Sequence, residues 1–375
     1  MATSLPARAF ARAPGTARRK APLWALLATS ACCGLAASPA AAQTWTVQPG
    51  HRAVDGNGVD LVNGGFYLDF KEGSIGSGKA ELALVRRNAN VSQWDNIFLE
   101  RTQSGSAATV TVTVGRETET FTGTISSLTS TAADGGSLAV GGGGYLYTTH
   151  DGTVIEFTDP TNHGWNGATN FCYYDTAQTS SCRLIPDQVT APDGKSLYLA
   201  WDIADHCSTT FNPDNSLDCE YFWRISAIDN DFGYALLFAY ASDIGGGTYG
   251  SLPPSAWTQR MRTDFFNTAV STTGAQGSVT YAYPSSTATD MTDMAGRTWR
   301  FTALSGSGAP SGIRRPGAST DEVSVSYGTG TVAVTKNGVT TSYSRSVSGT
   351  TATTTVTDPL SHTTTEVADI TKGRV

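Results

Sequence analysis

Six cysteines are the residues of this chain whose chemistry depends most on the compartment in which the protein works. Cys32 and Cys33 lie in an apolar N-terminal stretch. The remaining four are the candidates for disulfide bonds: Cys172, Cys182, Cys207 and Cys219. An even number of cysteines in an exported chain favours disulfides, and local spacing favours Cys172–Cys182 and Cys207–Cys219 among three connectivities. A zinc site is the alternative, although no Cys-x-x-Cys pair supports it.

A loop between Cys207 and the segment after Cys219 alternates oxygen-bearing side chains. These candidate ligands are Asn212, Asp214, Ser216, Asp218 and Glu220. Hard oxygen donors at every second residue suit Ca²⁺. The loop lacks the central glycine and the closing glutamate of an EF-hand, so a solvated acidic loop is the alternative. The sequence therefore offers calcium as a candidate, assigns no other metal and predicts no cofactor.

Aromatic residues gather around the same cysteines in the sequence. They are Trp165, Tyr173, Tyr174, Trp201, Tyr221, Phe222 and Trp223. Rings of this kind can stack on sugars, and Trp165 and Trp201 are the candidate carbohydrate-binding residues. The alternative is that the rings are buried between sheets, where aromatic side chains contribute large buried areas.

The catalytic motifs that the chain approaches are all incomplete. A phosphate-loop pattern runs from Gly73 to Lys79, but Ala80 stands where the motif needs Ser or Thr as a magnesium ligand. A glycine turn before a strand is the better interpretation. Neither a Gly-x-Ser-x-Gly elbow nor a His-Glu-x-x-His helix occurs. Glycosidase-type carboxylate candidates are common to β proteins of this size: Glu100, Asp175 and Glu220. We assign no catalytic residue and expect a protein that is not an enzyme.

Residues 1–42 have the three parts of a secretory signal peptide. A basic head precedes an apolar run from Ala21 to Ala37, and small residues lead to a cleavage site near Ala42. A membrane anchor is the alternative, but the run is short and rich in alanine. Twin-arginine export at Arg18 and lipidation at Cys32 both lack flanking residues that such signals use. We expect a secreted, cell-surface or periplasmic protein.

Charge excludes two classes of partner for the exported chain. The full sequence has a net charge of −7, and removing the leader with its five basic residues brings it to about −12. Acidic surfaces repel phosphate backbones and anionic lipids. No later stretch is long and apolar enough to span a membrane as a helix. We therefore expect neither nucleic acid nor a membrane-spanning segment.

Polar and apolar residues alternate through most of the chain. Such runs occur at residues 109–114, 196–201, 322–327, 331–335 and 340–343. This period predicts strands with one dry and one wet face. Asn337-Gly338 between two of the runs predicts a tight hairpin. The apolar stretch from Ile225 to Ala241 contains Asp231 and Gly233, which favours two strands. The predicted fold is all-β, with twisted antiparallel sheets and β-hairpins.

A further pattern consists of an aspartate, about three residues, Gly-Arg and then a strand. It occurs at residues 292–301 and, in modified form, at 357–366 and 368–375. Here the sequence resembles the YD repeats of bacterial RHS proteins. The region before these units, with segments 57–86, 150–157 and 231–240, resembles the part that precedes those repeats. Ser361-His362 stands where Gly-Arg is usual, and Glu366 stands where an aromatic residue is usual.

The resemblance covers about residues 50 to 375 and implies a β-sheet that spirals into a hollow shell around a toxin or adhesive segment. We expect an N-terminal β domain over residues 43–253 and a truncated repeat segment over residues 254–375. Further C-terminal repeats or cargo are the expected partners, with carbohydrate or cell-envelope components as others. The leading hypothesis is a structural protein for envelope interaction or polymorphic-toxin delivery. A carbohydrate-binding surface module and a polysaccharide-active enzyme are the alternatives.

Overall fold

The protein is built almost entirely from antiparallel β-sheet, as its alternating sequence predicts. The computed structural model describes residues 53–87, 93–115, 117–124, 126–131, 135–141, 144–158, 172–174, 179–211, 217–242 and 257–370. Backbone alone is described for 172–174, 179–182, 203–211 and 217–222. Within these ranges helical structure occurs at Trp257 and as a 3₁₀ turn at Gly78–Ala80. Strands β3 to β24 make a 22-stranded sheet system, and β1 and β2 form a separate hairpin.

One layer of the N-terminal half is built around a short meander. Its strands pair in the order β10, β11, β3, β4, β5, β6. Their bounds are β3 Ile97–Ser104, β4 Ala107–Val114, β5 Glu117–Thr124, β6 Ser127–Ser130, β10 Cys172–Tyr174 and β11 Thr179–Thr190. β11 is shared with the second layer, because its residues 179–184 pair with β3 and its residues 185–190 pair with β9.

The second layer begins with β7 Ser137–Gly141, β8 Gly144–Thr148 and β9 Val154–Thr158. It continues from β11 through an unbroken antiparallel meander to β24. The strands of its first half are β12 Ser196–Phe211, β13 Leu217–Asn230, β14 Tyr234–Tyr240, β15 Arg260–Asn267, β16 Gly277–Ser285 and β17 Ala288–Thr292.

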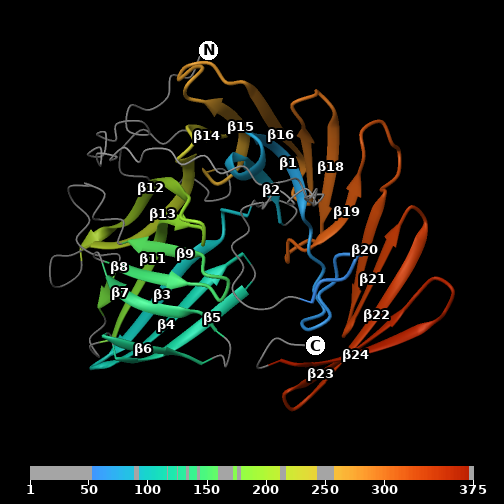
Figure 1. Cartoon of the computed structure of the whole chain (residues 1–375), viewed down its shortest axis with the longest axis horizontal. Coiled ribbons are helices and arrows are strands. Elements are labelled where there is room, and N and C mark those ends of the chain that lie inside the picture. Colours follow the sequence, from blue (N-terminus) through green and yellow to red (C-terminus); the bar gives the residue numbers. More distant parts are fainter. Residues whose placement is uncertain are drawn as a thin grey trace, which may run out of the picture.

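The remaining strands of the meander fan out at the C-terminal side of the molecule, coloured orange to red in Figure 1. They are β18 Thr298–Ala303, β19 Pro310–Arg314, β20 Val323–Gly328, β21 Thr331–Lys336, β22 Val339–Ser348, β23 Thr351–Thr357 and β24 Thr363–Asp369. Each pairs with the next in sequence. β14 and β15 pair across residue 253, so one sheet runs through the expected domain boundary.

One kind of turn closes many of the hairpins. In the example at Asp293, the aspartate carbonyl accepts from Gly296 N–H at 2.9 Å, and its carboxylate accepts from Arg297 N–H at 3.0 Å. Gly296 has φ of +76°, which a side chain would strain. Equivalent turns occur at residues 55–58, 149–152, 191–194, 230–233 and 358–361. Residues 336–339 instead form the tight hairpin predicted from Asn337-Gly338, and both residues have positive φ.

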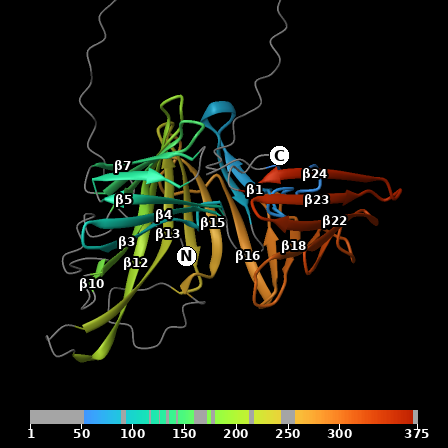
Figure 2. The same ribbon diagram turned by 90° about the horizontal axis from the view of Figure 1, so that it is seen from below.

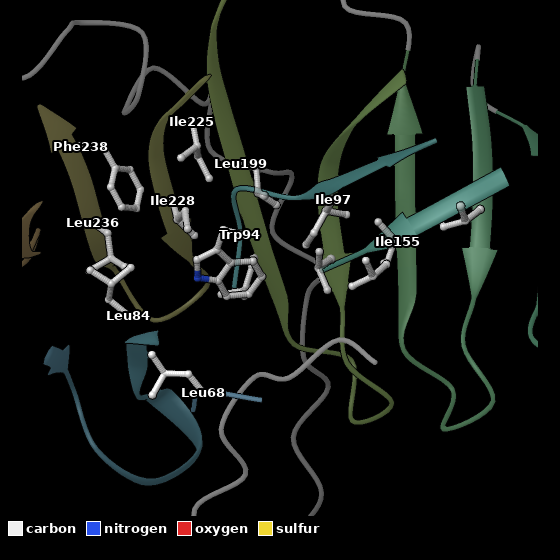
Figure 3. Close-up of a cluster of buried hydrophobic side chains, with 14 of the residues drawn as sticks. Leu68, Leu84, Trp94, Ile97, Ile155, Leu199, Ile225, Ile228, Leu236 and Phe238 are labelled. Atoms are coloured by element: carbon white, nitrogen blue, oxygen red, sulfur yellow. The ribbon is translucent and has the colours of Figure 1, made fainter. Parts of the chain in front are cut away.

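A single apolar core joins the two layers and the N-terminal hairpin. Its members include Trp94, which is 1% exposed and sits among side chains from β2, β12, β13 and β14 in Figure 3. The predicted strands therefore bury their apolar faces as the alternation requires. The stretch from Ile225 to Ala241 forms two strands joined by a turn at Gly233, as expected.

The N-terminal hairpin, β1 Phe70–Ile75 and β2 Leu82–Arg86, packs against the meander. The Phe70 ring meets Trp299 and Phe301 edge-on, with centroids 4.9 and 5.0 Å apart. The glycine-rich segment of the incomplete phosphate-loop pattern forms the turn of this hairpin, as predicted. In Figure 1 the hairpin, in blue, lies between the two halves of the sheet. Residues near opposite ends of the chain are thus joined in one fold.

Candidate interaction surface at the last strand

The turn at Asp358 sets the direction of β24. The Asp358 carboxylate accepts from the N–H groups of Leu360 and His362, both at 2.8 Å. Its other oxygen lies 2.9 Å from His362 Nδ1. The hydrogen bonds with the His362 side chain and backbone lower the pKa of Asp358. Ser361 has φ of +67° and so takes the left-handed position that Gly296 fills in the equivalent turn.

β24 is paired along one side. Its register with β23 has no bulge: Thr363 lies opposite Thr357 at one end, and Asp369 lies opposite Thr351 at the other. β3 follows β24 in the strand order of the sheet system, but no register of residues joins the two. Figures 1 and 2 place them at opposite sides of the molecule. Among the described strands, β24 therefore forms a ladder with β23 alone.

The hydrogen-bond pattern tells which backbone groups of β24 face outward. Ile370 N–H donates to Thr350 O at 2.8 Å, and Asp358 N–H donates to His362 O at 2.9 Å. Even-numbered residues of β24 therefore point their amide and carbonyl groups toward β23. The alternate residues, Thr363, Thr365 and Val367, direct theirs toward the open side of the sheet. An open edge of this kind is a template for a further strand.

The inner face of the last strands is the one that carries Tyr343, Arg345 and Thr354. These side chains bind the N-terminal segment: Tyr343 contacts Asp55, Arg345 donates to Val62 O at 2.8 Å, and Thr354 donates to Leu61 O at 2.7 Å. Burial and the bond to Asp55 raise the pKa of the Tyr343 hydroxyl. The N-terminal segment thus holds β22 and β23 in position.

Two rows of side chains cross the inner face and end on β24. In one row, Val347 of β22 lies beside Ala352 and then Ala368. In the other row, Arg345 lies beside Thr354 and then Glu366. Ala368 is 2% exposed, whereas Val367 on the opposite face is 55% exposed. Glu366 is partly buried and has no ion-pair partner in the described part of the chain.

The outer face of the same strands carries mostly hydroxyl groups, together with Val367 and Asp369 on β24. The positions opposite to the inner rows on β22, β23 and β24 are Ser342, Ser344, Ser346, Thr353, Thr355, Thr363 and Thr365. They are exposed or partly exposed. Hydroxyls can both donate and accept hydrogen bonds, so these seven positions are solvated without carrying charge. The sequence expectation of a wet, Ser/Thr-rich outer face agrees with this arrangement.

One buried ion pair away from this surface joins Glu72 and Arg86. Glu72 and Arg86 join across β1 and β2 at 2.5 Å, and their side chains are 2% and 4% exposed. Tyr281 of β16 donates to the second Glu72 oxygen at 2.5 Å. The Arg86 guanidinium lies over the Phe301 ring at 4.4 Å. This network therefore fastens the N-terminal hairpin to the meander.

A second buried carboxylate, Glu119, is saturated by donors. It accepts from Ser130 and Tyr147 hydroxyls at 2.7 Å each and from Gly136 N–H at 3.1 Å. Burial and the bond to Glu119 raise the pKa of Tyr147. Thr and Glu alternate at the start of β5, so the sequence did not indicate that the Glu119 side chain faces inward. Glu119 is therefore a structural carboxylate, because it has no remaining geometry for a reacting group.

The four cysteines of the disulfide prediction lie in paired strands. Cys172 of β10 is directly opposite Cys182 of β11. Cys207 of β12 is directly opposite Cys219 of β13. Their side chains are outside the described part of the structure. The backbone register is the one that the two local pairs need, and the disulfides themselves stay a prediction.

The predicted calcium and carbohydrate residues lie partly outside the described structure. Asn212, Asp214, Ser216 and Trp165 lie outside the described residues, as do the side chains of Asp218 and Glu220. Trp201 is partly buried against the core, and its indole N–H donates to Pro186 O at 2.7 Å. This placement favours the core alternative for Trp201. Within the described ranges, no group of three or more His, Cys, Asp or Glu residues could hold a metal.

A surface arrangement that the sequence did not suggest surrounds Arg183. Its guanidinium lies over the Phe98 ring at 4.1 Å and over the Trp223 ring at 5.0 Å. It also pairs with Glu100 at 2.7 Å, so this glycosidase-type candidate is bound to a cation. Asp175 and Glu220 contribute no described side chain beside it. The alternation in β3 places Phe98 outward, but the approach of Trp223 depends on the long pairing of β12 and β13.

Comparison with known proteins identifies no family for the chain. No protein-family model matches it. No curated protein matches it either. A solved porin-like protein from Bacteroides uniformis aligns with 73% of this chain and 93% of its own length, at 9% identity and a TM-score of 0.18. That TM-score is too low to support a statement about function. Within the described residues, no helix has the length and apolar character needed to cross a bilayer.

Proposed function

We propose that this chain is an exported, non-catalytic structural protein that forms the N-terminal part of an RHS-type shell wall. The observation that carries the proposal is the unbroken meander from β11 to β24, with its inner face covered by residues 53–87. A sheet that extends by repeated hairpins can be lengthened strand by strand without changing its core. The turns at Asp293 and Asp358, where an aspartate closes a hairpin, fit the YD-like pattern of the sequence.

Buried carboxylates also support a structural role. Glu72 and Glu119 are both saturated by donors, and neither faces an open site among the described residues. Partly buried aspartates such as Asp293 and Asp358 close turns. The partner of the wall would be further repeats or an enclosed cargo, and the site of action would be the cell envelope or the exterior.

Export and lack of turnover can be tested together. The full chain, expressed in a bacterium, should appear in the periplasm or medium, whereas a chain without residues 2–42 should stay in the cytoplasm. The exported chain should leave a panel of soluble polysaccharides uncut. Turnover that a single carboxylate substitution abolishes would contradict the non-catalytic role, and cytoplasmic retention of the full chain would contradict export.

A carbohydrate-binding surface is the second candidate, and the stack at Arg183 favours it. Phe98 and Trp223 are partly exposed, and each has a ring face under the Arg183 guanidinium, which pairs with Glu100. Rings and charged groups of this kind can bind a sugar by stacking and hydrogen bonds. On a glycan array, Trp223→Ala should abolish binding. Phe232→Ala, at an exposed ring elsewhere, is the matched control and should not change it.

A further inference from the structure

We infer that the open side of β24 is a strand-acceptor site, and that its occupant is an extended strand with an inward apolar residue followed two positions later by an inward basic residue. This inference rests on the proposed function in one respect, which is that the strand comes from further repeats of the same wall. Backbone pairing would supply affinity, and the two inward side chains would supply selectivity.

The edge lacks most of the features that normally prevent strand addition, and Glu366 is the one charged side chain of β24 on the inner face. Proline, lysine, bulges and inward charges that clash with a partner are the usual protections. β24 contains neither proline nor lysine, and its register with β23 has no shift. The backbone N–H and C=O groups of Thr363, Thr365 and Val367 face away from β23, as the pattern of hydrogen bonds requires. A strand can therefore add without displacing any part of the ladder.

The two rows on the inner face specify the side chains of the added strand. The row through Val347, Ala352 and Ala368 is small and apolar, so it continues best with an apolar residue. The row through Arg345 and Thr354 ends on Glu366. Arg345 lies two strands away, about 10 Å at ordinary strand spacing, and is bound to Val62 O. A basic residue in the added strand would lie directly beside Glu366 and pair with it.

A second copy of this chain does not meet that requirement. β24 carries Glu366 and Asp369 and no basic residue, so two copies pairing through this edge would add acidic side chains to an acidic interface. Antiparallel addition of a different strand gives a defined probe. The blocked peptide Thr-Val-Thr-Arg-Thr-Val-Thr places its first Val beside Ala368 and its Arg beside Glu366, with threonines outward.

The decisive experiment measures binding of this labelled peptide to the full chain by fluorescence anisotropy. Glu366→Lys should weaken binding about fivefold, and a peptide with Glu in place of Arg should recover it on that variant. Val367→Pro should abolish binding, because it removes an outward N–H and leaves the ladder to β23 intact. Val367→Thr is the control that keeps the N–H. Equal affinity for the Arg and Glu peptides would overturn the assignment.

Hydrogen exchange locates the bound peptide independently. The amides of Thr363, Thr365 and Val367 should gain protection, and the amides already bonded to β23 should change little. Protection elsewhere, or dimerisation of the free chain that Val367→Pro abolishes, would refute the proposed occupant. The same strand fused behind residue 375 by a flexible linker should exclude the free peptide if a continuing polypeptide can supply it. An unchanged free-peptide affinity would refute a continuing polypeptide as the source of the strand. Neither result depends on the export and turnover tests.

Discussion

Single buried side chains decide how the N-terminal hairpin is attached to the sheet. Glu72 accepts from Arg86 and from Tyr281, so a residue of β1 joins a residue of β2 to a strand far along the chain. A buried pair with satisfied hydrogen bonds contributes little by itself relative to an apolar pair. Removal of one charged partner is costly, because the other charge stays buried without compensation.

Glu72→Gln should therefore destabilise the protein by about 3–5 kcal/mol, since Arg86 would lose its buried counter-charge. Tyr281→Phe, which removes a neutral donor from the same carboxylate, should cost about 1–3 kcal/mol. Urea unfolding followed by tryptophan fluorescence measures both. The order of the two effects is the test: a larger loss for Tyr281→Phe would show that Arg86 has another source of charge compensation.

Ser361 offers a substitution in the stabilising direction. Its φ of +67° is unfavourable for a residue with a Cβ, and a glycine would relieve that strain. Ser361→Gly should raise the free energy of unfolding by about 1 kcal/mol. Gly296→Ala, at the same position of the turn at Asp293, should lower it by a similar amount. Thermal unfolding of the two variants checks the pair, and a destabilised Ser361→Gly would refute the shared turn geometry.

Aspartate turns link the strands of the meander and respond to pH. Burial acts to raise the pKa of Asp293, but bonds from Arg297, Trp299 and Ala295 outweigh it and lower the pKa. A lowered pKa in the folded state adds stability at pH values above the unfolded pKa of about 4. That stability is lost as the pH falls through the folded value. Asp358 follows the same rule through its bonds with His362.

Melting temperatures measured from pH 7 down to pH 3 should therefore fall at the acid end. Asp293→Asn should be less stable than the parent chain at pH 7 and should lose less on acidification, because one group that must be protonated is gone. Asp187→Asn, on a strand and outside the turns, is the comparison at equal charge. Parallel pH profiles for the parent chain and Asp293→Asn would contradict the assigned role of this turn.

The elements were more predictable than the contacts between them. Alternation gave β4, β12, β20, β21 and β22, and the Asn337-Gly338 pair gave its hairpin, because both signals are local. The inward turn of Glu119 and the stack at Arg183 depend on strands distant in sequence. The packing of residues 53–68 over the inner face also depends on strands that are distant in sequence. Local patterns cannot specify such partners, so the candidate surface was predictable only as an exposed edge.

Strand register makes the disulfide prediction sharper than spacing alone. Cys172 is opposite Cys182, and Cys207 is opposite Cys219. Peptide mapping of the exported chain under non-reducing conditions should recover these two linked pairs. Cys207→Ser should free a single thiol on Cys219 and leave the other link unchanged. Four reactive thiols in the exported chain, or zinc released on thiol modification, would contradict this pairing.

The fold as a whole depends on contacts between residues 53–68 and the last described strands. Asp55, Val62 and Leu61 contact β22 and β23 from nearly three hundred residues away in sequence. The segment also buries Val59 and Phe66, which are 0% and 4% exposed. A curved sheet with a dry inner face needs such a cover, because exposed apolar positions on that face would destabilise the strands. The N-terminal segment therefore stabilises the same strands that carry the open edge.

Tyr343→Phe tests this long-range connection. The substitution keeps the buried ring and removes the hydroxyl that contacts Asp55 and Asn57, leaving the Asp55 carboxylate with fewer donors. It should cost about 1–3 kcal/mol, and hydrogen exchange should quicken in residues 53–62 as well as in β21–β23. Tyr327→Phe removes a hydroxyl that donates to Pro310 O, so its effect should stay near β19 and β20. If Tyr343→Phe left residues 53–62 as protected as before, the segment would be held by its apolar side chains alone. The polar contacts to β22 and β23 would then have no part in fixing the last strands.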